Sequence, residues 1–344
     1  MSSVHFHRLR VAEKTDETHD SCSVTFELAP RQREFFGYRP GQFLTVRIPD
    51  GDSSIARCYS LASSPHTGER LRIAVKRVDG GLGSNWICDH VRAGTEIDVL
   101  EPAGTFTPKS YGEDHLLFAG GSGITPIMSI LRSLLAEGDG RAYLYYANRD
   151  EDSVIFKGEL KDLQAEHPGR LVIHHVLESV QGLPTAASVQ AYARGLTGLP
   201  VFICGPKPFM AVVRETLREL GFPREKVRVE RFNSLGGNPF EAATPLPPES
   251  PEEDAAEVDV AIEGRQHKLA WPRDQRLLDL LVAHGLNAPS SCSEGVCASC
   301  ECRVLEGEVR MVNNQVLEEE DLADGYVLAC QALPITDHIR IEYS

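Results

Sequence analysis

Four cysteines near the end of the chain restrict its fold more than any other sequence feature. Cys292, Cys297 and Cys300 follow the spacing C-x4-C-x2-C, and Cys330 follows at a distance. This is the plant-type spacing of ligands for a [2Fe–2S] cluster, in which one tight loop supplies three thiolates. A structural zinc site usually pairs two C-x2-C knuckles, and this sequence contains one. We therefore expect a [2Fe–2S] centre held by these four thiolates.

Two further residues of the cysteine loop bear on this prediction. Cys302 is a fifth nearby thiol, and we expect it to be a strand residue after the loop because four ligands are already present. Ala298 stands where such loops commonly have glycine, so the backbone should be more crowded there without the loss of a ligand. Around the loop, residues 257–344 also predict a hairpin at Glu263-Gly264 and a helix over 276–284.

A proline-rich, acidic stretch separates this segment from the rest of the chain. Residues 236–256 include five prolines and the run Glu252-Glu253-Asp254. Prolines and like charges with little apolar content cannot bury a core, so we expect a linker there. From Glu249 to Ser344 the chain carries 20 acidic and 7 basic residues, and hence −13 of the total net charge of −15. The acidity is thus a property of the C-terminal module.

The residues before the linker show two different strand patterns. In residues 1–111, short β-type runs (22–28, 43–48, 71–78 and 96–100) are separated by turns with little sign of helix, which predicts an antiparallel barrel. In residues 112–235, strands alternate with helices, which predicts a parallel sheet with flanking helices. The expected strands of this second domain are 116–119, 142–147, 171–177, 201–204 and 227–232.

A glycine-rich turn follows the first strand of the second domain. The run Gly120-Gly121-Ser122-Gly123-Ile124-Thr125-Pro126 predicts a helix that begins at Pro126, with Thr125 as its N-cap and Gly138 as its end. Glycines let the backbone approach a pyrophosphate, and a helix N-terminus offers free N–H groups. The spacing is not that of the G-x-G-x-x-G motif. Cys204-Gly205-Pro206 ends another strand, at the sheet edge where ligands collect, although Cys204 could also be a buried structural residue.

A third set of residues lies in the predicted barrel. Arg57-Cys58-Tyr59-Ser60, Val75-Lys76-Arg77 and Gly81-Leu82-Gly83-Ser84 combine cations, an aromatic ring, hydroxyls and glycines. Arg57 and Lys76 could neutralise a pyrophosphate, with backbone amides of Gly83 and Ser84 in support. Each run alone is weak evidence for a binding site, since the first is equally consistent with a strand and the last with a plain turn.

Together these features resemble the ferredoxin–NADP reductase superfamily over the whole chain, in the order flavin barrel, nicotinamide domain and ferredoxin domain. Residues 57–66, 83–91, 146–156 and 201–210 look most like the reductase components of 3-ketosteroid 9-alpha-hydroxylases, and those of phenylacetyl-CoA oxygenation share much of this. The resemblance implies FAD as the flavin and a β-grasp (α+β) fold for the ferredoxin domain.

The same resemblance implies a role for each site residue. Arg57, Tyr59 and Ser60 would hold the flavin, with Ser60 near its N5 and Tyr59 against its ring, while Lys76, Gly83 and Ser84 would reach its phosphates. Val75 is a further candidate cofactor-binding residue. The nicotinamide nucleotide would bind at Gly120, Gly121, Ser122, Gly123, Thr125, Cys204, Gly205 and Pro206. Cys204 would lie beside the reacting ring, and Glu230 and Phe232 belong to a segment that ends over the flavin.

These parts predict one electron path. Hydride carries two electrons and a [2Fe–2S] centre accepts one, so a flavin is needed between them. We expect electrons to pass from NADH to FAD, to the cluster and to a separate terminal oxygenase, plausibly a Rieske-type steroid hydroxylase. A phenylacetyl-CoA oxygenase or a desaturase is an alternative partner. An electron carrier or redox sensor with a degenerate nicotinamide site is a different class of function, against which the glycines at 120, 121 and 123 argue.

Charge and hydropathy narrow the possible partners. The net charge of −15 argues against nucleic acid or an anionic membrane as the main partner. No apolar run is long enough to cross a bilayer, and the N-terminus lacks a secretory pattern, so we expect a cytoplasmic protein. We also expect a monomer. NADH should be preferred over NADPH, because Arg149 is followed by the three carboxylates of Asp150, Glu151 and Asp152, which would repel a 2′-phosphate.

Overall fold

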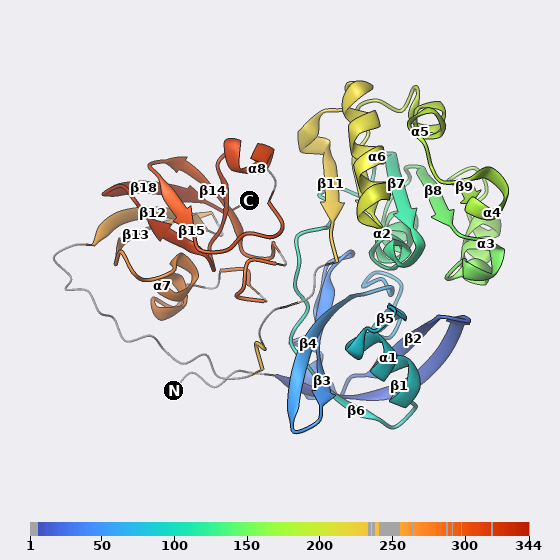
Figure 1. The fold of residues 1–344 in the computed structure, drawn as a ribbon, viewed down its shortest axis with the longest axis horizontal. Coiled ribbons are helices and arrows are strands. Elements are labelled where there is room, and N and C mark those ends of the chain that lie inside the picture. Colours follow the sequence, from blue (N-terminus) through green and yellow to red (C-terminus); the bar gives the residue numbers. More distant parts are fainter. Residues whose placement is uncertain are drawn as a thin grey trace. The chain divides into compact units, whose positions relative to one another are not determined.

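The computed structural model describes residues 6–232, 235, 238–240, 255–262, 264–286, 288–290, 292–296, 298–317 and 319–343. These residues form two compact units, Phe6–Phe232 and the C-terminal residues beyond it. Each unit is described by itself below (Figure 1). Cys297, Glu263 and most of the predicted linker lie outside the described residues.

The first domain of the Phe6–Phe232 unit is an antiparallel barrel. Its six strands hydrogen-bond in the order β4-β3-β6-β1-β2-β5. The strands are β1 (His7–Thr18), β2 (Ser21–Glu27), β3 (Phe43–Asp50), β4 (Ser53–Ser60), β5 (Arg72–Lys76) and β6 (Glu96–Val99). Past the end of β4, Leu61 pairs with Ile73 of β5, which brings the two outer strands together. Leu9, Val24 and Leu44 are fully buried, and the predicted barrel is confirmed.

A helix in the barrel domain corrects the sequence prediction of little helix. Helix α1 spans Leu82–His90 and follows Gly81, so the run read as a plain turn is a helix N-terminus. Two glycines at the start of the helix lower its intrinsic propensity, which hides it from pattern reading. Ile87 is fully buried against the barrel, and this packing holds the helix in place.

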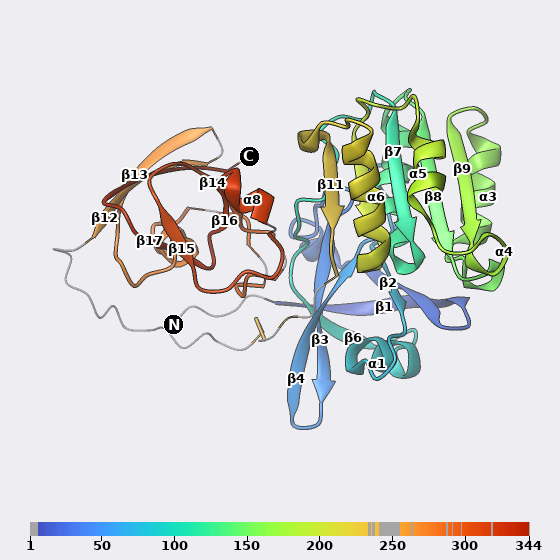
Figure 2. The ribbon, with the colours of Figure 1, turned by 45° about the horizontal axis from the view of Figure 1, so that its top comes forward.

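The second domain is a parallel five-stranded sheet with helices on both faces (Figure 2). The strand order is β11-β10-β7-β8-β9. The strands are β7 (His115–Gly120), β8 (Ala142–Asn148), β9 (Leu171–Leu177), β10 (Val201–Cys204) and β11 (Val227–Glu230). The helices are α2 (Ile124–Glu137), α3 (Lys157–Glu166), α4 (Glu178–Gln181), α5 (Ala186–Ala193) and α6 (Lys207–Glu219). Buried side chains of α2 and α3 pack on one face of the sheet and those of α5 and α6 on the other.

Two predicted boundaries in this domain are wrong. Helix α2 begins at Ile124 with Gly123 at its N-cap, so Thr125 lies inside the helix. The Thr125 hydroxyl instead donates to the carbonyl of Ser122 at 2.9 Å, and the short 3-10 turn Gly121–Gly123 leads directly into the helix. Strand β11 ends at Glu230, two residues before the predicted end at Phe232.

The C-terminal unit is a mixed sheet with one helix packed on it, the predicted α+β arrangement. Its main sheet has the order β13-β12-β18-β14-β16, with β12 and β18 parallel and the other pairs antiparallel. The strands are β12 (Ala256–Ile262), β13 (Arg265–Trp271), β14 (Glu301–Glu306), β16 (Tyr326–Leu328) and β18 (His338–Glu342), with a separate pair of β15 (Val309–Met311) and β17 (Ala332–Pro334). Helix α7 (Leu277–Ala283) packs on the sheet, and α8 (Glu319–Ala323) precedes β16. Ile262 pairs with Arg265, which confirms the hairpin predicted between them.

The described residues include no helix that is both long and apolar enough to cross a membrane.

Candidate cofactor-binding sites

Strand β4 and helix α1 meet at the predicted flavin site. A Cβ on Gly83 would lie 2.8 Å from Cγ of Arg57 and 3.0 Å from the hydroxyl oxygen of Tyr59. A side chain at position 83 would therefore have to displace both neighbours. Ser60, at the end of β4, is buried opposite Phe43 of β3. The fold thus brings together Arg57, Tyr59 and Gly83, three of the residues predicted to hold the flavin.

The first turn of α1 carries possible hydrogen-bond donors. The N–H of Val78 donates to the Ser84 hydroxyl oxygen at 3.0 Å, which leaves the Ser84 proton available for an acceptor. Helix N-termini carry unpaired N–H groups and positive potential, and Arg57 adds a cation beside them. The Val75 side chain is buried in the barrel core, so only its backbone could face a cofactor.

The glycine-rich turn and the end of β10 lie against each other. A Cβ on Gly123 would lie 2.2 Å from the carbonyl oxygen of Cys204, and one on Gly120 would lie 2.9 Å from Cδ of Pro206. Gly121 has a positive φ of 51°, which favours glycine. The two motifs predicted for the nicotinamide nucleotide therefore form one surface at the carboxyl edge of the sheet.

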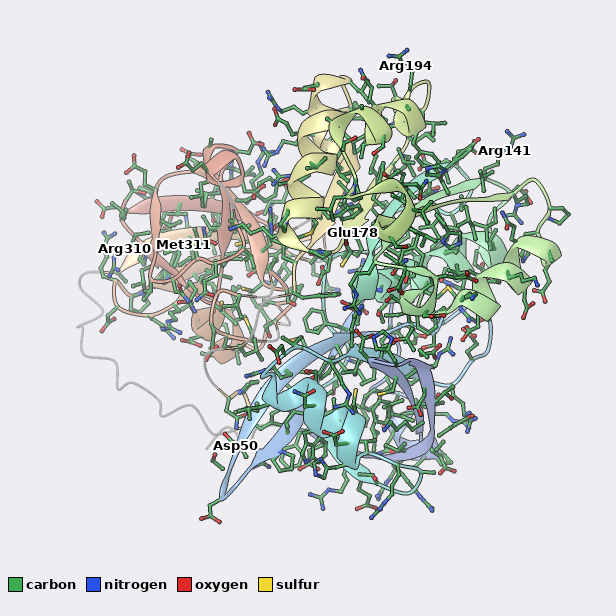
Figure 3. The ribbon with its side chains drawn as sticks, turned by 45° about the vertical axis from the view of Figure 1, so that its right-hand side comes forward. Asp50, Arg141, Glu178, Arg194, Arg310 and Met311 are labelled. Carbon is green, nitrogen blue, oxygen red and sulfur yellow. The ribbon has the colours of Figure 1, made fainter. Side chains whose placement is uncertain are left out.

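This edge of the sheet faces the barrel. Figure 3 shows Arg141, before β8, on the side away from the barrel, and Glu178, after β9, nearer to it. Lys76, at the end of β5 in the barrel, places its Nζ 3.9 Å from the position of a Cβ on Gly121. Lys76 is thus close to the glycine turn of the second domain, as well as being a candidate for the flavin phosphates.

Cys204 and Glu230 are neighbours across β10 and β11. Cys204 is fully buried; burial raises the pKa of its thiol, and the Glu230 carboxylate raises it further. Part of the Glu230 side chain reaches solvent, yet desolvation of the carboxyl group raises its pKa to about 8. Phe232, just past the strand, is 49% exposed, a large apolar surface for a ring to cover. Near neutral pH this corner of the site offers uncharged groups.

Three of the four predicted cluster ligands gather in the C-terminal unit. The Cys330 thiol interacts with the thiols of Cys292 and Cys300, and the Cys330 N–H donates to Sγ of Cys300 at 3.5 Å. The N–H of Glu294 donates to Sγ of Cys292 at 3.3 Å. Clustered sulfurs that accept amide N–H groups suit a [2Fe–2S] centre, which fits the residues present. Among the described residues, which do not include Cys297, no three His, Cys, Asp or Glu side chains are placed to hold a single metal ion.

The other two loop residues behave differently from each other. Cys302 lies on β14 and is buried in the core, which confirms its expected place in a strand, and burial raises the pKa of its thiol. Ala298 has a φ of +54°, the left-handed region in which glycine is favoured. The crowding expected at Ala298 therefore takes the form of a left-handed backbone conformation, which the Cβ of alanine disfavours.

Asp20 lies beside the proposed nucleotide sites and was not predicted from the sequence. Asp20, between β1 and β2, lies 3.6 Å from Lys76 Nζ and accepts a hydrogen bond from Arg149 of the second domain at 2.7 Å. Desolvation opposes ionisation of the Asp20 carboxyl, but its hydrogen bond with Thr18, followed by the charges of Lys76, His19 and Arg149, lowers its pKa. No local motif marks Asp20, because Lys76 and Arg149 come from distant segments of the chain.

Three family descriptions match successive parts of the chain. Residues 8–107 match the "Oxidoreductase FAD-binding domain", residues 117–215 the "Oxidoreductase NAD-binding domain" and residues 260–334 the "2Fe-2S iron-sulfur cluster binding domain". A relative from Rhodococcus rhodochrous, "3-ketosteroid-9-alpha-monooxygenase, ferredoxin reductase component", is 52% identical over 97% of this chain and 96% of its own length. The chain belongs to the ferredoxin reductase family. It is an oxidoreductase with FAD, NAD and [2Fe–2S] domains, as the sequence predicted.

Other members show how far this ferredoxin reductase architecture extends. A component of the 1,2-phenylacetyl-CoA epoxidase of Escherichia coli (strain K12) is 33% identical over 98% of both chains. The solved structure of phthalate dioxygenase reductase is 26% identical, with a TM-score of 0.60 over 99% of this chain and all of that one. That reductase is described as a modular structure for electron transfer from pyridine nucleotides to [2Fe–2S].

Proposed function

We propose that this ferredoxin reductase carries electrons from NADH through FAD and its [2Fe–2S] cluster to the oxygenase of a 3-ketosteroid 9-alpha-hydroxylase. The supporting observation is that four relatives named "3-ketosteroid-9-alpha-monooxygenase, ferredoxin reductase component", at 46–52% identity, match at least 97% of this chain. The phenylacetyl-CoA epoxidase component is more distant, at 33%. The oxygenase is a separate protein of Rieske type in this proposal, and the reductase acts as a cytoplasmic monomer.

The barrel residues bind and orient the flavin in this proposal. The first-turn amides of α1, the Ser84 hydroxyl and Arg57 hold the FAD phosphates, while Tyr59 and Ser60 contact its ring. When bound, FAD accepts the two electrons of a hydride and releases them singly. Lys76 lies where it can neutralise a phosphate of either nucleotide, since it reaches the glycine turn from the barrel side.

The second domain places the nicotinamide nucleotide at the carboxyl edge of its sheet. Residues 120–125 hold the pyrophosphate, and Gly205 and Pro206 close the other side of the turn. Cys204 and Glu230, both uncharged near pH 7, exclude water and present neutral groups to the nicotinamide. The proposed domains are the flavin barrel (1–111), the nicotinamide domain (112–235) and the ferredoxin domain (257–344). Residues 236–256 link the second domain to the third.

Cofactor analysis and reconstitution test this function. The purified chain should yield one FAD and two irons, and NADH should bleach the flavin rapidly without oxygen; recovery of FMN or zinc, or slow bleaching, contradicts the proposal. Cys300→Ser should lose most of the cluster, whereas the matched variant Cys302→Ser should retain it.

With a 3-ketosteroid 9-alpha-hydroxylase oxygenase, the chain should support NADH-dependent steroid hydroxylation. Support of a phenylacetyl-CoA epoxidase alone would reassign the partner.

A further inference from the structure

Two thiols outside the proposed electron path lie side by side in the barrel. Cys22 of β2 and Cys88 of α1 place their Sγ atoms 3.5 Å apart, and neither forms a disulfide. Cys22 is 1% exposed and Cys88 is 9% exposed, so Cys88 is the more accessible residue of the two. A disulfide requires about 2.05 Å between sulfurs, so the pair needs an approach of only about 1.5 Å.

The surroundings give the two thiols different acidities. The hydrogen bond with Cys22 lowers the pKa of Cys88, and the cations Arg77 and Lys14 lower it further, against the opposing effects of desolvation and of the Asp89 carboxylate. The Lys14 ammonium also donates to the Cys88 carbonyl. The same pairing raises the pKa of Cys22. A thiol of lowered pKa beside cations, with a second thiol in contact, is the arrangement of a reactive cysteine and its resolving partner.

We propose that Cys22 and Cys88 form a peroxide-sensitive dithiol that closes to a disulfide. The Cys88 thiolate attacks one oxygen of hydrogen peroxide; the O–O bond breaks, hydroxide leaves and a sulfenic acid forms. The Cys22 sulfur then attacks the Cys88 sulfur, the S–O bond breaks, and water leaves with the Cys22 proton. The hydroxide takes up the proton first lost by Cys88. Two thiols are thus oxidised by two electrons, and one peroxide is reduced to two waters.

The pair is mechanically linked to the proposed flavin site. Cys88 lies on the same helix as Ser84, whose hydroxyl is hydrogen-bonded to Val78, and Arg77 donates to Asn85 of that helix at 3.2 Å. Drawing Cys88 toward β2 must shift a helix that these contacts hold from other sides. The first-turn amides would then lose their alignment with the FAD phosphates. This second step rests on the proposed function of α1, whereas disulfide formation does not.

Peptide mapping of the wild-type holoprotein tests disulfide formation directly. Trypsin separates the two cysteines into residues 15–31 and 78–92, each of which contains one cysteine. After submillimolar hydrogen peroxide and alkylation, the two peptides should appear as one linked species about 2 Da lighter than their sum, reversed by dithiothreitol. Cys58, a half-buried barrel thiol 3.6 Å from the Thr45 hydroxyl, is the internal control and should stay alkylatable. Peptides that remain separate, or an equal loss of Cys58, overturn the proposal.

Flavin release tests the link to the cofactor. After removal of peroxide, the oxidised chain should bind FAD about tenfold more weakly than the reduced chain, because small shifts in the phosphate donors are costly. Cys22→Ser and Cys88→Ser should each show no such loss after the same treatment, while Cys58→Ser should behave as wild type. A disulfide that forms without weakening FAD binding would overturn the link and count against α1 as the phosphate site. Weaker binding in the serine variants as well would assign the loss to another oxidised group.

Discussion

Arg149 donates to the carboxylate of Asp20 at 2.7 Å, although the two residues lie 129 positions apart. Asp20 belongs to the barrel and Arg149 follows β8 of the parallel-sheet domain, so the pair ties two domains together. Asp20 also lies 3.6 Å from Lys76, the barrel cation beside the glycine turn. The carboxylate therefore fixes the position of a cation that both proposed nucleotide sites share.

Neutralising Asp20 should weaken the nicotinamide site. In Asp20→Asn, Lys76 and Arg149 lose their common counter-charge, so we expect the KM for NADH to rise about threefold, with kcat and FAD content unchanged. The free energy of unfolding should fall by less than about 1 kcal/mol, since these ion pairs reach solvent. Steady-state kinetics with flavin quantification measure this. Asp98→Asn is the control, because Asp98 pairs with Arg8 at 2.8 Å within the barrel. Equal KM changes in both variants would contradict the role of Asp20.

The preference for NADH should exceed about tenfold in kcat/KM, equivalent to about 1.4 kcal/mol. The structure alters the argument from sequence: Asp150 accepts from the N–H of Ser153 at 2.9 Å, and Glu151 pairs with Lys157 at 2.6 Å. Two of the three carboxylates thus have local partners, and Arg149 is engaged by Asp20. A 2′-phosphate would meet little unpaired positive charge at this loop. Comparable kcat/KM values for NADPH and NADH would show that the loop does not govern the preference.

Glu230 should make stability depend on pH. Its pKa of about 8 in the folded chain exceeds the ordinary value of 4.5, so between these pH values only the folded state holds the proton. Stability from this group is complete below pH 4.5 and is lost as pH rises through 8. Relative to Glu230→Gln, the wild type should therefore become less stable from pH 5.5 to pH 8.5. Urea midpoints at both pH values measure this, and a constant difference would show that the carboxyl titrates normally.

Ala298→Gly should stabilise the C-terminal unit. The positive φ of Ala298 costs about 1 kcal/mol for a residue with a Cβ, and glycine removes this cost. The loss of cluster absorbance in urea should shift to a higher midpoint. Ala332→Gly is the control and should lower the midpoint, because Ala332 is buried in β17 and gains nothing from a freer backbone. A lower midpoint for Ala298→Gly would mean that the Cβ contributes packing that outweighs the strain.

The acidity of the last hundred residues should steer the encounter with the oxygenase. Screening shortens electrostatic fields to about 10 Å at 0.1 M salt, so reduction of the oxygenase should slow as salt rises. Flavin bleaching by NADH, within one chain, should barely change. Neutralising Glu318, Glu319 and Glu320 should lessen the salt effect if docking occurs near that run, of which Glu318 lies outside the described residues. Equally flat rates would leave solubility as the role of this charge.

The sequence predicted most strands because their apolar runs are continuous. The ranges 171–177 and 201–204 match β9 and β10 residue for residue. β10 is buried throughout and reads as a continuous apolar run, whereas β9, at the edge of the sheet, is only partly buried. Strand β1 went unpredicted, because in this polar run few positions face the core. Helix α1 was also missed, since its glycines disfavour a helix that tertiary packing nonetheless holds. Pairings such as Cys22 with Cys88 depend on strand order and helix placement, neither of which a linear motif records.

The backbone of Gly123 packs directly against the Cys204 carbonyl, so a backbone–backbone contact fixes the distance between the glycine turn and the end of β10. Side chains elsewhere in the parallel-sheet domain can then differ between relatives without altering the space left for a dinucleotide. A relative at 26% identity can keep the same architecture under this condition, provided that the residue at this contact stays glycine. We therefore expect the least sequence change at the glycine of this backbone contact and more change at side chains away from the turn.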